Sequence, residues 1–443
     1  MPDGRGPEGL IRTAWRVASV SRRRSTIRMS ILAFILHFVL LGFSIGLGVY
    51  WSILTWHVFR TLIRIPTAAK GVGVAELEAL PAGERPRVCV IVPAHNEAAC
   101  IAHVARSIAA SDYPRLSAVF SLDRCTDETE KVLRTTLETV DRPERFEVLP
   151  IAHCPTEWAG KVHALWRAVQ DTSAAREADI LLFIDADTTL HPRCVTHTVA
   201  LLRSRELGML SLLSTLTCDQ PFEFVAQTAA GMELARQYPI ERANAKTHRR
   251  AFANGQFLMF AREAYERVGG HEAVRHALLE DMELARLCER RGVAAGLFLA
   301  DGMHSCRMYA NWREFRRGWK RIYTECANLR IGRLRASATR VRFTGVVLPL
   351  AALTAVVVGG AHGGANLSDV FAAITMITGL LGLAAYAAGL AACHKVGRAP
   401  ALSALAYPVG AWLVGSILKE AASDLKSNTP TVWGGREYVR TAR

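Results

Sequence analysis

Two aspartates separated by one residue, Asp185 and Asp187, directly follow the apolar run 180–184. An apolar run of this length is typical of a strand buried inside a sheet, and open α/β sheets bind ligands at the carboxyl ends of their strands. Two adjacent carboxylates ionise together at a cost unless positive charge lies beside them. Because hard oxygen ligands suit Mg²⁺ or Mn²⁺, the pair predicts a divalent cation that carries a diphosphate. The alternative interpretation is a strand followed by a solvated acidic turn, and other features of the sequence are needed to decide between the two.

The elements that position these carboxylates alternate along the middle of the chain. We expect strands at 88–93, 118–122, 146–151, 180–184 and 209–216, with helices at 97–111, 127–138 and 160–170 between them. Such alternation is typical of an α/β domain. Because the carboxyl ends of parallel strands meet at one edge of a sheet, the loops after the first, second and fourth strands are expected to converge.

Polar residues in these loops have the chemistry of a nucleotide site. Asp123 and Glu97 can accept hydrogen bonds from a base or from ribose hydroxyls, and Asp187 can hold a cation for the phosphates. Lys161 begins an expected helix, where its charge and the helix N-terminus favour a phosphate. No G-x-G-x-x-G fingerprint follows the first expected strand, no G-x-x-x-x-G-K-[ST] P-loop occurs anywhere in the sequence, and the α/β segment has no G-x-S-x-G nucleophile elbow.

A pair of acids, Glu280 and Asp281, opens a further expected helix. Acids in a first turn are stabilised by the helix dipole by about 0.3–1 kcal/mol, which makes capping one interpretation. The other is a general base that removes a proton from an acceptor hydroxyl. The pair alone leaves both interpretations open.

Four long apolar stretches predict a multi-pass protein of the cell membrane. Half of the 443 residues are hydrophobic and the mean hydropathy is +0.15. Residues 31–59, 343–361, 370–393 and 401–418 contain no Asp, Glu, Lys or Arg, and each approaches the length that crosses a bilayer core of about 30 Å. Buried helices of a soluble domain would show a polar face, and 31–59 is too long for a cleavable signal peptide.

The net charge of +14 suggests an anionic partner. Basic residues cluster beside the apolar stretches, with Arg22, Arg23, Arg24 and Arg28 before the first and ten Lys or Arg between Arg313 and Arg342 before the second. This placement favours anionic lipid headgroups and predicts no nucleic-acid partner. The ten cysteines form no C-x-x-C pair and are expected to be reduced thiols of a cytoplasmic domain.

Residues 311–323 predict an amphipathic helix. Trp312, Phe315, Trp319 and Ile322 recur at three- and four-residue steps and share one face. Aromatic side chains opposite arginines are typical of a helix that lies in a membrane interface, so we place Trp312 and Trp319 on the acceptor side of the site. The alternative is an amphipathic helix packed on the domain.

Together these motifs resemble membrane-bound family 2 glycosyltransferases. The matching segments are VCVIVPAHNEA, SLDRCTDET, WAGKVHAL, FIDADTTL, ANGQFLMFAREAYERVGG and LLEDMELARLCERRG. The resemblance implies a GT-A, Rossmann-like α/β domain that binds a nucleotide-diphospho-sugar, with transmembrane helices on both sides and Mg²⁺ or Mn²⁺ as cofactor.

The resemblance also implies roles for individual residues. The donor-binding residues would be Pro93, Ala94, Glu97, Asp123, Lys161 and Asp185. Asp185 and Asp187 would form the D-x-D metal pair, with Asp187 nearest the metal. Asp281 would be the catalytic base, with Glu280 beside it, and Gly255 and Gln256 would line the acceptor side.

One motif departs from the family pattern. Processive polysaccharide synthases carry Q-x-x-R-W after the base, whereas the nearest match here, Arg313 to Trp319, is displaced. With few spans for a polymer channel, we expect an inverting transfer of one sugar to a lipid-phase hydroxyl. Residues 269–275 are similar to enzymes acting on carotenoid, hopanoid or sphingolipid-like acceptors. A processive synthase, a metal-dependent nucleotidyltransferase and a non-enzymatic scaffold are the alternatives.

The expected organisation follows from these segments. It comprises a poorly ordered basic tail (1–28), a transmembrane segment (29–65), a linker (66–86), a catalytic domain (86–305), basic interfacial helices (306–342), C-terminal transmembrane segments (343–420) and a basic tail (421–443). The basic stretch places the catalytic domain in the cytoplasm. The N-terminal tail is then either translocated or returned by a hairpin within 31–59, and 401–418 is expected to be re-entrant.

Overall fold

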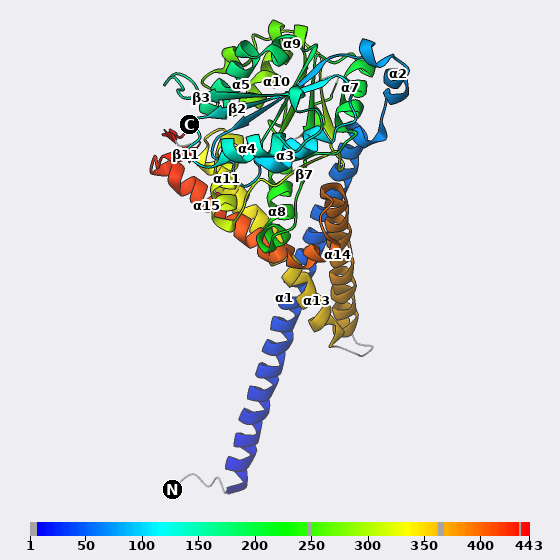
Figure 1. The fold of residues 1–443 in the computed structure, drawn as a ribbon. Coiled ribbons are helices and arrows are strands. Elements are labelled where there is room, and N and C mark those ends of the chain that lie inside the picture. Colours follow the sequence, from blue (N-terminus) through cyan, green and yellow to red (C-terminus); the bar gives the residue numbers. More distant parts are fainter. Residues whose placement is uncertain (1–6, 239, 246–249, 362–366, 434–435) are drawn as a thin grey trace. The chain divides into compact units, whose positions relative to one another are not determined.

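The computed structural model describes residues 7–238, 240–245, 250–361, 367–433 and 436–443 (Figure 1). The chain divides into two compact units, which we describe separately. One comprises Met1–Trp56 and Arg340–Ala392, and the other comprises His57–Thr339 and Cys393–Arg443.

The larger unit is built on a mixed seven-stranded sheet. Its strand order is β3-β2-β1-β4-β8-β6-β9. The strands are β1 (Val88–Ala94), β2 (Leu116–Asp123), β3 (Phe146–Ile151), β4 (Ile180–Ile184), β6 (Met209–Leu213), β8 (Phe257–Ala261) and β9 (Ala295–Leu299). Strands β3, β2, β1 and β4 are parallel, β8 is antiparallel to both β4 and β6, and β9 is parallel to β6. This is the α/β architecture that the sequence predicts.

Helices cover both faces of this sheet. They are α3 (Ile101–Ala109), α4 (Thr129–Leu137), α5 (Gly160–Asp171), α6 (Ser173–Arg176), α7 (Cys194–Ser204), α9 (Arg262–Arg267) and α10 (Glu280–Arg290). Alternate residues of β1 enter different cores, with Val90 and Val92 in one and Cys89 and Ile91 in the other. A strand buried on both faces has to be apolar at every position, which explains its continuous run.

A second, three-stranded sheet follows the paired aspartates. It consists of β5 (Thr188–Leu190), β10 (His304–Cys306) and β7 (Thr215–Leu216), with β10 antiparallel to β5 and parallel to β7. Its register places Cys306 opposite Thr188, one residue after Asp187. This pairing brings a segment more than a hundred positions away in the chain to the carboxyl end of β4.

Three helices form a layer within the larger unit: α8 (Pro221–Gln237), α11 (Trp312–Cys326) and α15 (Tyr407–Lys426), the last preceded by the short helix η7 (Ala401–Ala406). The aromatic face of α11 points into this layer, where Phe315 and Trp319 are buried and the hydroxyl of Tyr323 donates to the carbonyl of Ala230 (3.0 Å). The prediction that this face lies in a membrane interface is therefore wrong. The helix is packed on the domain.

The membrane-type helices are α1 (Pro7–Arg64), α12 (Ile331–Arg342), α13 (Leu348–Gly360) and α14 (Leu367–Gly397). By length and composition, four stretches of the described chain can cross a membrane: Ile31–Arg64, Ile331–Gly360, Asp369–Gly397 and Ala401–Lys426. Within the smaller unit, Trp51 is buried, stands edge-on to Tyr386 and donates through Nε1 to the carbonyl of Thr344 (3.3 Å).

Helix α1 is continuous through Gly42, Gly46 and Gly48, so the hairpin alternative for 31–59 is wrong. Glycine costs a helix only about 1 kcal/mol, and a helix in lipid must keep its backbone hydrogen bonds. The N-terminal tail, expected to be poorly ordered, is helical from Pro7, and residues 1–6 lie outside the described part of the chain.

The shorter elements complete the chain. They are η1 (Ala68–Lys70), α2 (Val74–Glu78), η2 (Ala82–Glu84), η3 (Pro143–Arg145), η4 (Ile240–Arg242), η5 (His271–Val274), the π-helical turn η6 (Phe343–Val347), β11 (Thr431–Trp433) and β12 (Arg436–Tyr438). Elements η1, α2 and η2 occupy the segment expected to be a linker.

Candidate active site

The strand order changes direction at β1, which lies between β2 and β4. Ligands of open α/β sheets bind outside the carboxyl ends of the strands at such a point. Pro93 and Ala94 end β1 and pair with Ser121 and Leu122 at the end of β2. Both predicted donor residues therefore lie beside Asp123, at the edge where the paired aspartates follow β4.

Asp123 is buried and held by its neighbour. The guanidinium of Arg124 donates to both carboxylate oxygens of Asp123, at 2.9 and 2.6 Å. Asn96 connects this loop to the one after β1, since its Oδ1 accepts from the backbone N–H of Thr126 (2.8 Å). Asn96 and Arg124 both have left-handed backbones, with φ of 58° and 49°. A carboxylate has further lone pairs, so Asp123 can still accept from a nucleotide.

Lys161 connects the D-x-D pair to the predicted base. Its Nζ lies 2.7 Å from Oδ1 of Asp185 and 2.8 Å from Oε1 of Glu280. Burial disfavours the charged amine, but the two carboxylates outweigh it and raise the pKa of Lys161. Burial likewise opposes the charge on Glu280, and Lys161 overcomes it and lowers the pKa of that carboxyl. The cluster is an ammonium shared between two carboxylates.

Asp281 lies at the end of this cluster. Its Oδ2 accepts from the backbone N–H of Gly255 (2.7 Å), and its Oδ1 accepts from the N–H of Met282 (2.7 Å). Burial, together with the negative charge of Glu280, raises the pKa of Asp281 to about 7. A carboxyl with this pKa is a competent proton acceptor near neutral pH, because general bases work best when their pKa is close to the working pH.

A side chain at position 255 would crowd three charged groups. A Cβ at this position would lie 3.1 Å from Oδ2 of Asp281, 3.2 Å from Oε1 of Glu280 and 3.3 Å from Nζ of Lys161. Its loop is fixed by Asn254, whose side chain donates to the carbonyl of Leu212 (2.9 Å). Gln256 accepts from the same side chain (3.3 Å). The structure thus places both predicted acceptor-side residues in a loop that borders Asp281, the predicted base.

Asp187 and Glu97 complete the acidic part of the site. Burial, followed by the charges of Asp185 and Glu97, raises the pKa of Asp187 to about 8. Burial also raises the pKa of Glu97, with a contribution from Asp185, although the thiol of Cys100 donates to it (3.1 Å). A divalent cation beside Asp187 would neutralise this crowding, so the donor set fits a hard metal ion.

Such an ion would draw only part of its ligands from the protein. In the described ranges, no three His, Cys, Asp or Glu side chains are grouped closely enough to hold a metal. Mg²⁺ is commonly bound by one or two carboxylates, with water and substrate phosphates as the other ligands. The arrangement around Asp185 and Asp187 is of that type.

Several residues near the site were not predicted from the sequence. Arg124 neutralises Asp123, and the buried thiol of Cys306 lies 3.5 Å from Oδ1 of Asp187. His271 is buried near Glu280 and Lys161, with its Nδ1 2.8 Å from the hydroxyl of Tyr265. Local sequence gave no signal for Cys306, since only the pairing of β10 with β5 brings it to the site.

The predicted acceptor-side tryptophans have different environments. Trp319 is 1% exposed and packs between Phe315 and Tyr323. It cannot contact an acceptor, so this assignment is corrected to a packing role. Trp312 is half-buried and stacks on Phe315, with ring centroids 5.4 Å apart.

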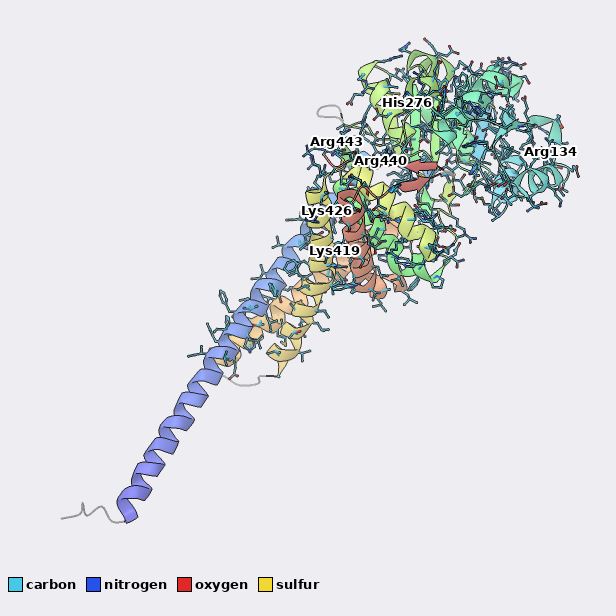
Figure 2. The ribbon with its side chains drawn as sticks, turned by 90° about the vertical axis from the view of Figure 1, so that its left-hand side faces the viewer. Arg134, His276, Lys419, Lys426, Arg440 and Arg443 are labelled. Atoms are coloured by element: carbon cyan, nitrogen blue, oxygen red, sulfur yellow. The ribbon has the colours of Figure 1, made fainter. Side chains whose placement is uncertain are left out.

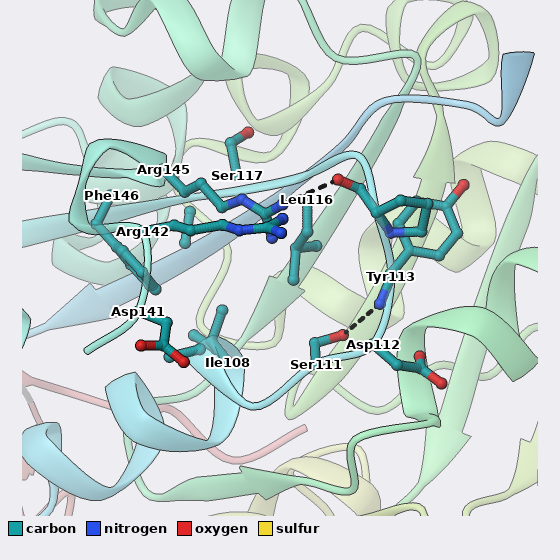
Figure 3. A pocket seen from close by; sticks show the side chains of 13 residues that line it. Ile108, Ser111, Asp112, Tyr113, Leu116, Ser117, Asp141, Arg142, Arg145 and Phe146 are labelled. Atoms are coloured by element: carbon teal, nitrogen blue, oxygen red, sulfur yellow. Dashed lines mark hydrogen bonds between the residues drawn. The ribbon is translucent and has the colours of Figure 1, made fainter. Parts of the chain in front are cut away.

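A cavity of about 360 Å³ lies at the opposite edge of the sheet (Figure 3). Leu116, which starts β2, and Phe146, which starts β3, contribute to its lining together with Arg142 and Arg145. Arg145 donates to the carbonyl of Pro114 (3.1 Å). None of the predicted site residues lines this cavity.

Comparison with known proteins identifies the class to which this site belongs. A family model described as "Glycosyltransferase like family 2" matches residues 86–319, which is more than half of the chain. The chain therefore belongs to glycosyltransferase family 2, whose members transfer a sugar from a nucleotide sugar. A search of curated proteins found no match.

Two solved structures are among those to which the chain is similar. The mannosyltransferase PcManGT from Pyrobaculum calidifontis, in complex with GDP-Man and Mn²⁺, is 18% identical, with a TM-score of 0.41, over 87% of this chain and 98% of that one. Glucosyl-3-phosphoglycerate synthase from Mycobacterium tuberculosis, in complex with Mg²⁺ and UDP, is 22% identical, with a TM-score of 0.36, over 57% of this chain and 81% of that one.

Proposed function

We propose that this glycosyltransferase transfers one sugar, with inversion, from a nucleotide-diphospho-sugar to a hydroxyl of a lipid-phase acceptor at the cytoplasmic membrane face. The observation that carries the proposal is the continuous cluster from Asp185 through Lys161 and Glu280 to Asp281. It connects the predicted phosphate side of the site to a carboxyl suited to proton removal.

The donor side would use the residues at the ends of β1, β2 and β4. Asp123 and Glu97 would accept hydrogen bonds from the nucleoside, with Pro93 and Ala94 beside it. Asp185 and Asp187 would hold Mg²⁺ or Mn²⁺, which supplies positive charge to the leaving diphosphate. Lys161 lies in the first turn of α5, so its ammonium and the helix N-terminus both favour the phosphates.

On the acceptor side, Asp281 would take the proton from the acceptor hydroxyl. The hydroxyl oxygen then bonds to the anomeric carbon as the bond from that carbon to the diphosphate oxygen breaks. A single displacement of this kind inverts the anomeric centre. The N–H of Gly255 holds the carboxylate of Asp281 in position throughout.

A lipid-phase acceptor is supported by the apolar stretches on both sides of the family domain. Basic residues of α11 and α12 support the cytoplasmic face, because Lys and Arg beside membrane spans are retained on that side. The exposed arginines Arg313, Arg317, Arg333 and Arg335 are candidates for contact with anionic headgroups.

The decisive experiment uses the full chain in lipid nanodiscs that contain extracted membrane lipids. Nucleotide sugars are supplied one at a time with Mn²⁺, Mg²⁺ or a chelator, and the lipids are analysed by mass spectrometry. We expect a lipid product one sugar heavier that depends on metal and is lost in Asp281→Asn. Release of nucleotide without any glycosylated lipid, in the presence of all lipid fractions, would reject the lipid acceptor.

A further inference from the structure

The fourth apolar stretch, Ala401–Lys426, is long enough to cross a membrane, but its contacts describe another arrangement. Just before it, Arg398 forms an ion pair with Asp301 in the loop between β9 and β10 (3.0 Å). After it, Arg440 pairs with Glu325 of α11 (2.7 Å), and the backbone N–H of Arg443 donates to the carbonyl of Leu329. Both ends of the stretch are therefore fixed to the glycosyltransferase unit. A crossing would separate them by a bilayer.

One face of the stretch is part of that unit. Its buried residues are Tyr407, Gly410, Ala411, Val414, Gly415, Ile417, Leu418, Ala421, Ala422 and Leu425. Gly410 lies against the carbonyl of Val225 on α8, where a Cβ would clash. Arg316 pairs with Glu420 (2.6 Å), and Lys320 of α11 pairs with Asp424. A helix with one face in protein cannot be surrounded by lipid.

The opposite face changes character along its length. Its first part exposes large apolar side chains, Leu402, Leu405, Val409 and Trp412, which are 70%, 82%, 56% and 53% exposed. Seven residues beyond Trp412, the same face exposes Lys419, followed by Ser423 and Lys426. Figure 2 labels the two lysines. Trp412 is the last residue of the apolar part, and tryptophan is enriched where a membrane meets water.

We propose that this face, which we call the graded face, is a membrane-binding surface of the glycosyltransferase unit. Its apolar end, from Leu402 to Trp412, enters the boundary between headgroups and acyl chains. Lys419 and Lys426, about two and four turns beyond Trp412, meet anionic headgroups. Helix α14, a candidate span, ends at Gly397, so the chain leaves the membrane next to this apolar end. The stretch thus lies along the membrane and does not cross it.

This inference concerns the surface alone and holds for any acceptor, so it stands apart from the proposed function. Membrane binding as such does not test it, because α1, α13 and α14 are expected to anchor the chain in any case. A depth measurement on the face itself is needed.

The test introduces a photo-crosslinking amino acid at single positions of the full chain. The positions are Leu405 and Trp412 on the apolar end, Ser423 on the basic end, and Val72, an exposed apolar residue elsewhere in the same unit, as the matched control. Each variant is reconstituted into phosphatidylcholine–phosphatidylglycerol vesicles, irradiated and analysed by mass spectrometry.

We expect lipid adducts at Leu405 and Trp412 in at least tenfold excess over Val72, and few acyl adducts at Ser423. If phosphatidylglycerol increases the number of adducts relative to phosphatidylcholine alone, the substitutions Lys419→Gln and Lys426→Gln should abolish that increase. Adducts no more frequent than at Val72 would overturn the proposal, as would crosslinks between two copies of the chain at Leu405. If acyl chains label Leu405 and Ser423 equally, the stretch crosses the membrane and the proposal is wrong.

Discussion

Asp281 is the residue at which burial and hydrogen bonding have the clearest chemical consequence. Replacing it by Asn keeps its shape but removes the proton acceptor, so we expect kcat to fall by about 10²–10⁴, the usual contribution of a general base. Donor affinity should stay unchanged in calorimetric titration. Glu283→Gln is the matched control, because Glu283 lies on the same helix and pairs with Arg286 at the surface. A collapse of donor affinity in Asp281→Asn would assign Asp281 to donor binding.

The raised pKa of Asp281 also predicts the direction of the pH dependence. With a pKa of about 7, the carboxyl is protonated and inactive below that value and ionised above it. Turnover at low substrate, kcat/KM, should therefore rise about tenfold per pH unit below 7 and level off above it. The profile is measured with saturating metal between pH 5 and pH 9. A profile that is flat between pH 5 and pH 7 would contradict the assignment.

Asp187 is expected to be needed only where a metal is involved. Asp187→Ala should abolish turnover and weaken donor binding in the presence of Mn²⁺, while donor binding in chelator stays as in the unmodified protein. Asp171→Ala, which removes a surface partner of Arg167, serves as the control. Equal donor affinity of the Asp187→Ala variant and the unmodified protein in Mn²⁺ would show that the ion binds elsewhere.

The positions of the candidate site residues were predictable where the motif itself lies at the end of a strand. Asp185, Asp187 and Lys161 come together as expected, because a buried strand or a helix start fixes each of them locally. Arg124 and Cys306 were not predictable. Arg124 acts through a left-handed turn, and Cys306 reaches Asp187 only through the pairing of β10 with β5.

At the scale of elements, the sequence correctly predicts which residues of α11 share a face, but it predicts the wrong environment for that face. The sequence shows that Trp312, Phe315 and Trp319 share a face, and it cannot show what covers that face. The cover comes from α8 and α15, the latter almost a hundred residues further along the chain. Strands β3 and β4 match their expected bounds, whereas the expected strand 209–216 divides at Ser214 into β6 and β7, which belong to different sheets.

The packing role of Trp319 has a measurable consequence. Trp319→Ala would leave a cavity between Phe315 and Tyr323, which typically costs about 3–5 kcal/mol for a buried aromatic residue. We expect a clearly lower unfolding temperature in detergent, with a smaller change in Trp312→Ala, since Trp312 is only half-buried. An unchanged unfolding temperature in Trp319→Ala would contradict the packing role.

At the scale of the whole molecule, the continuity of α1 determines the topology that we predict. An uninterrupted helix of 58 residues is about 87 Å long and has no point at which to return. If it crosses the bilayer once, its ends lie on opposite faces, and the basic residues before 29 are translocated despite their charge. Spans α13 and α14 then bring the chain back to the side of the sheet.

This topology predicts the accessibility of tags. In sealed inverted vesicles, a tag after Arg443 should be removed by added protease, and a tag before Met1 should be protected until detergent is added. Both tags cleaved before detergent would mean that α1 does not cross, whatever its hydropathy. The same preparation without vesicle inversion provides the control, with the two patterns exchanged.

The crowding around the α-carbon of Gly255 has a consequence for directed evolution of this enzyme. The three charged groups around its α-carbon leave no room for even a methyl group without displacement. If these residues line the acceptor side as predicted, libraries intended to change acceptor selectivity should keep position 255 constant and vary Gln256, whose side chain accepts a hydrogen bond from Asn254 (3.3 Å). If Asp281 is the base, acceptor selectivity can change through the side chains around it, while the Gly255 backbone that holds its carboxylate is kept.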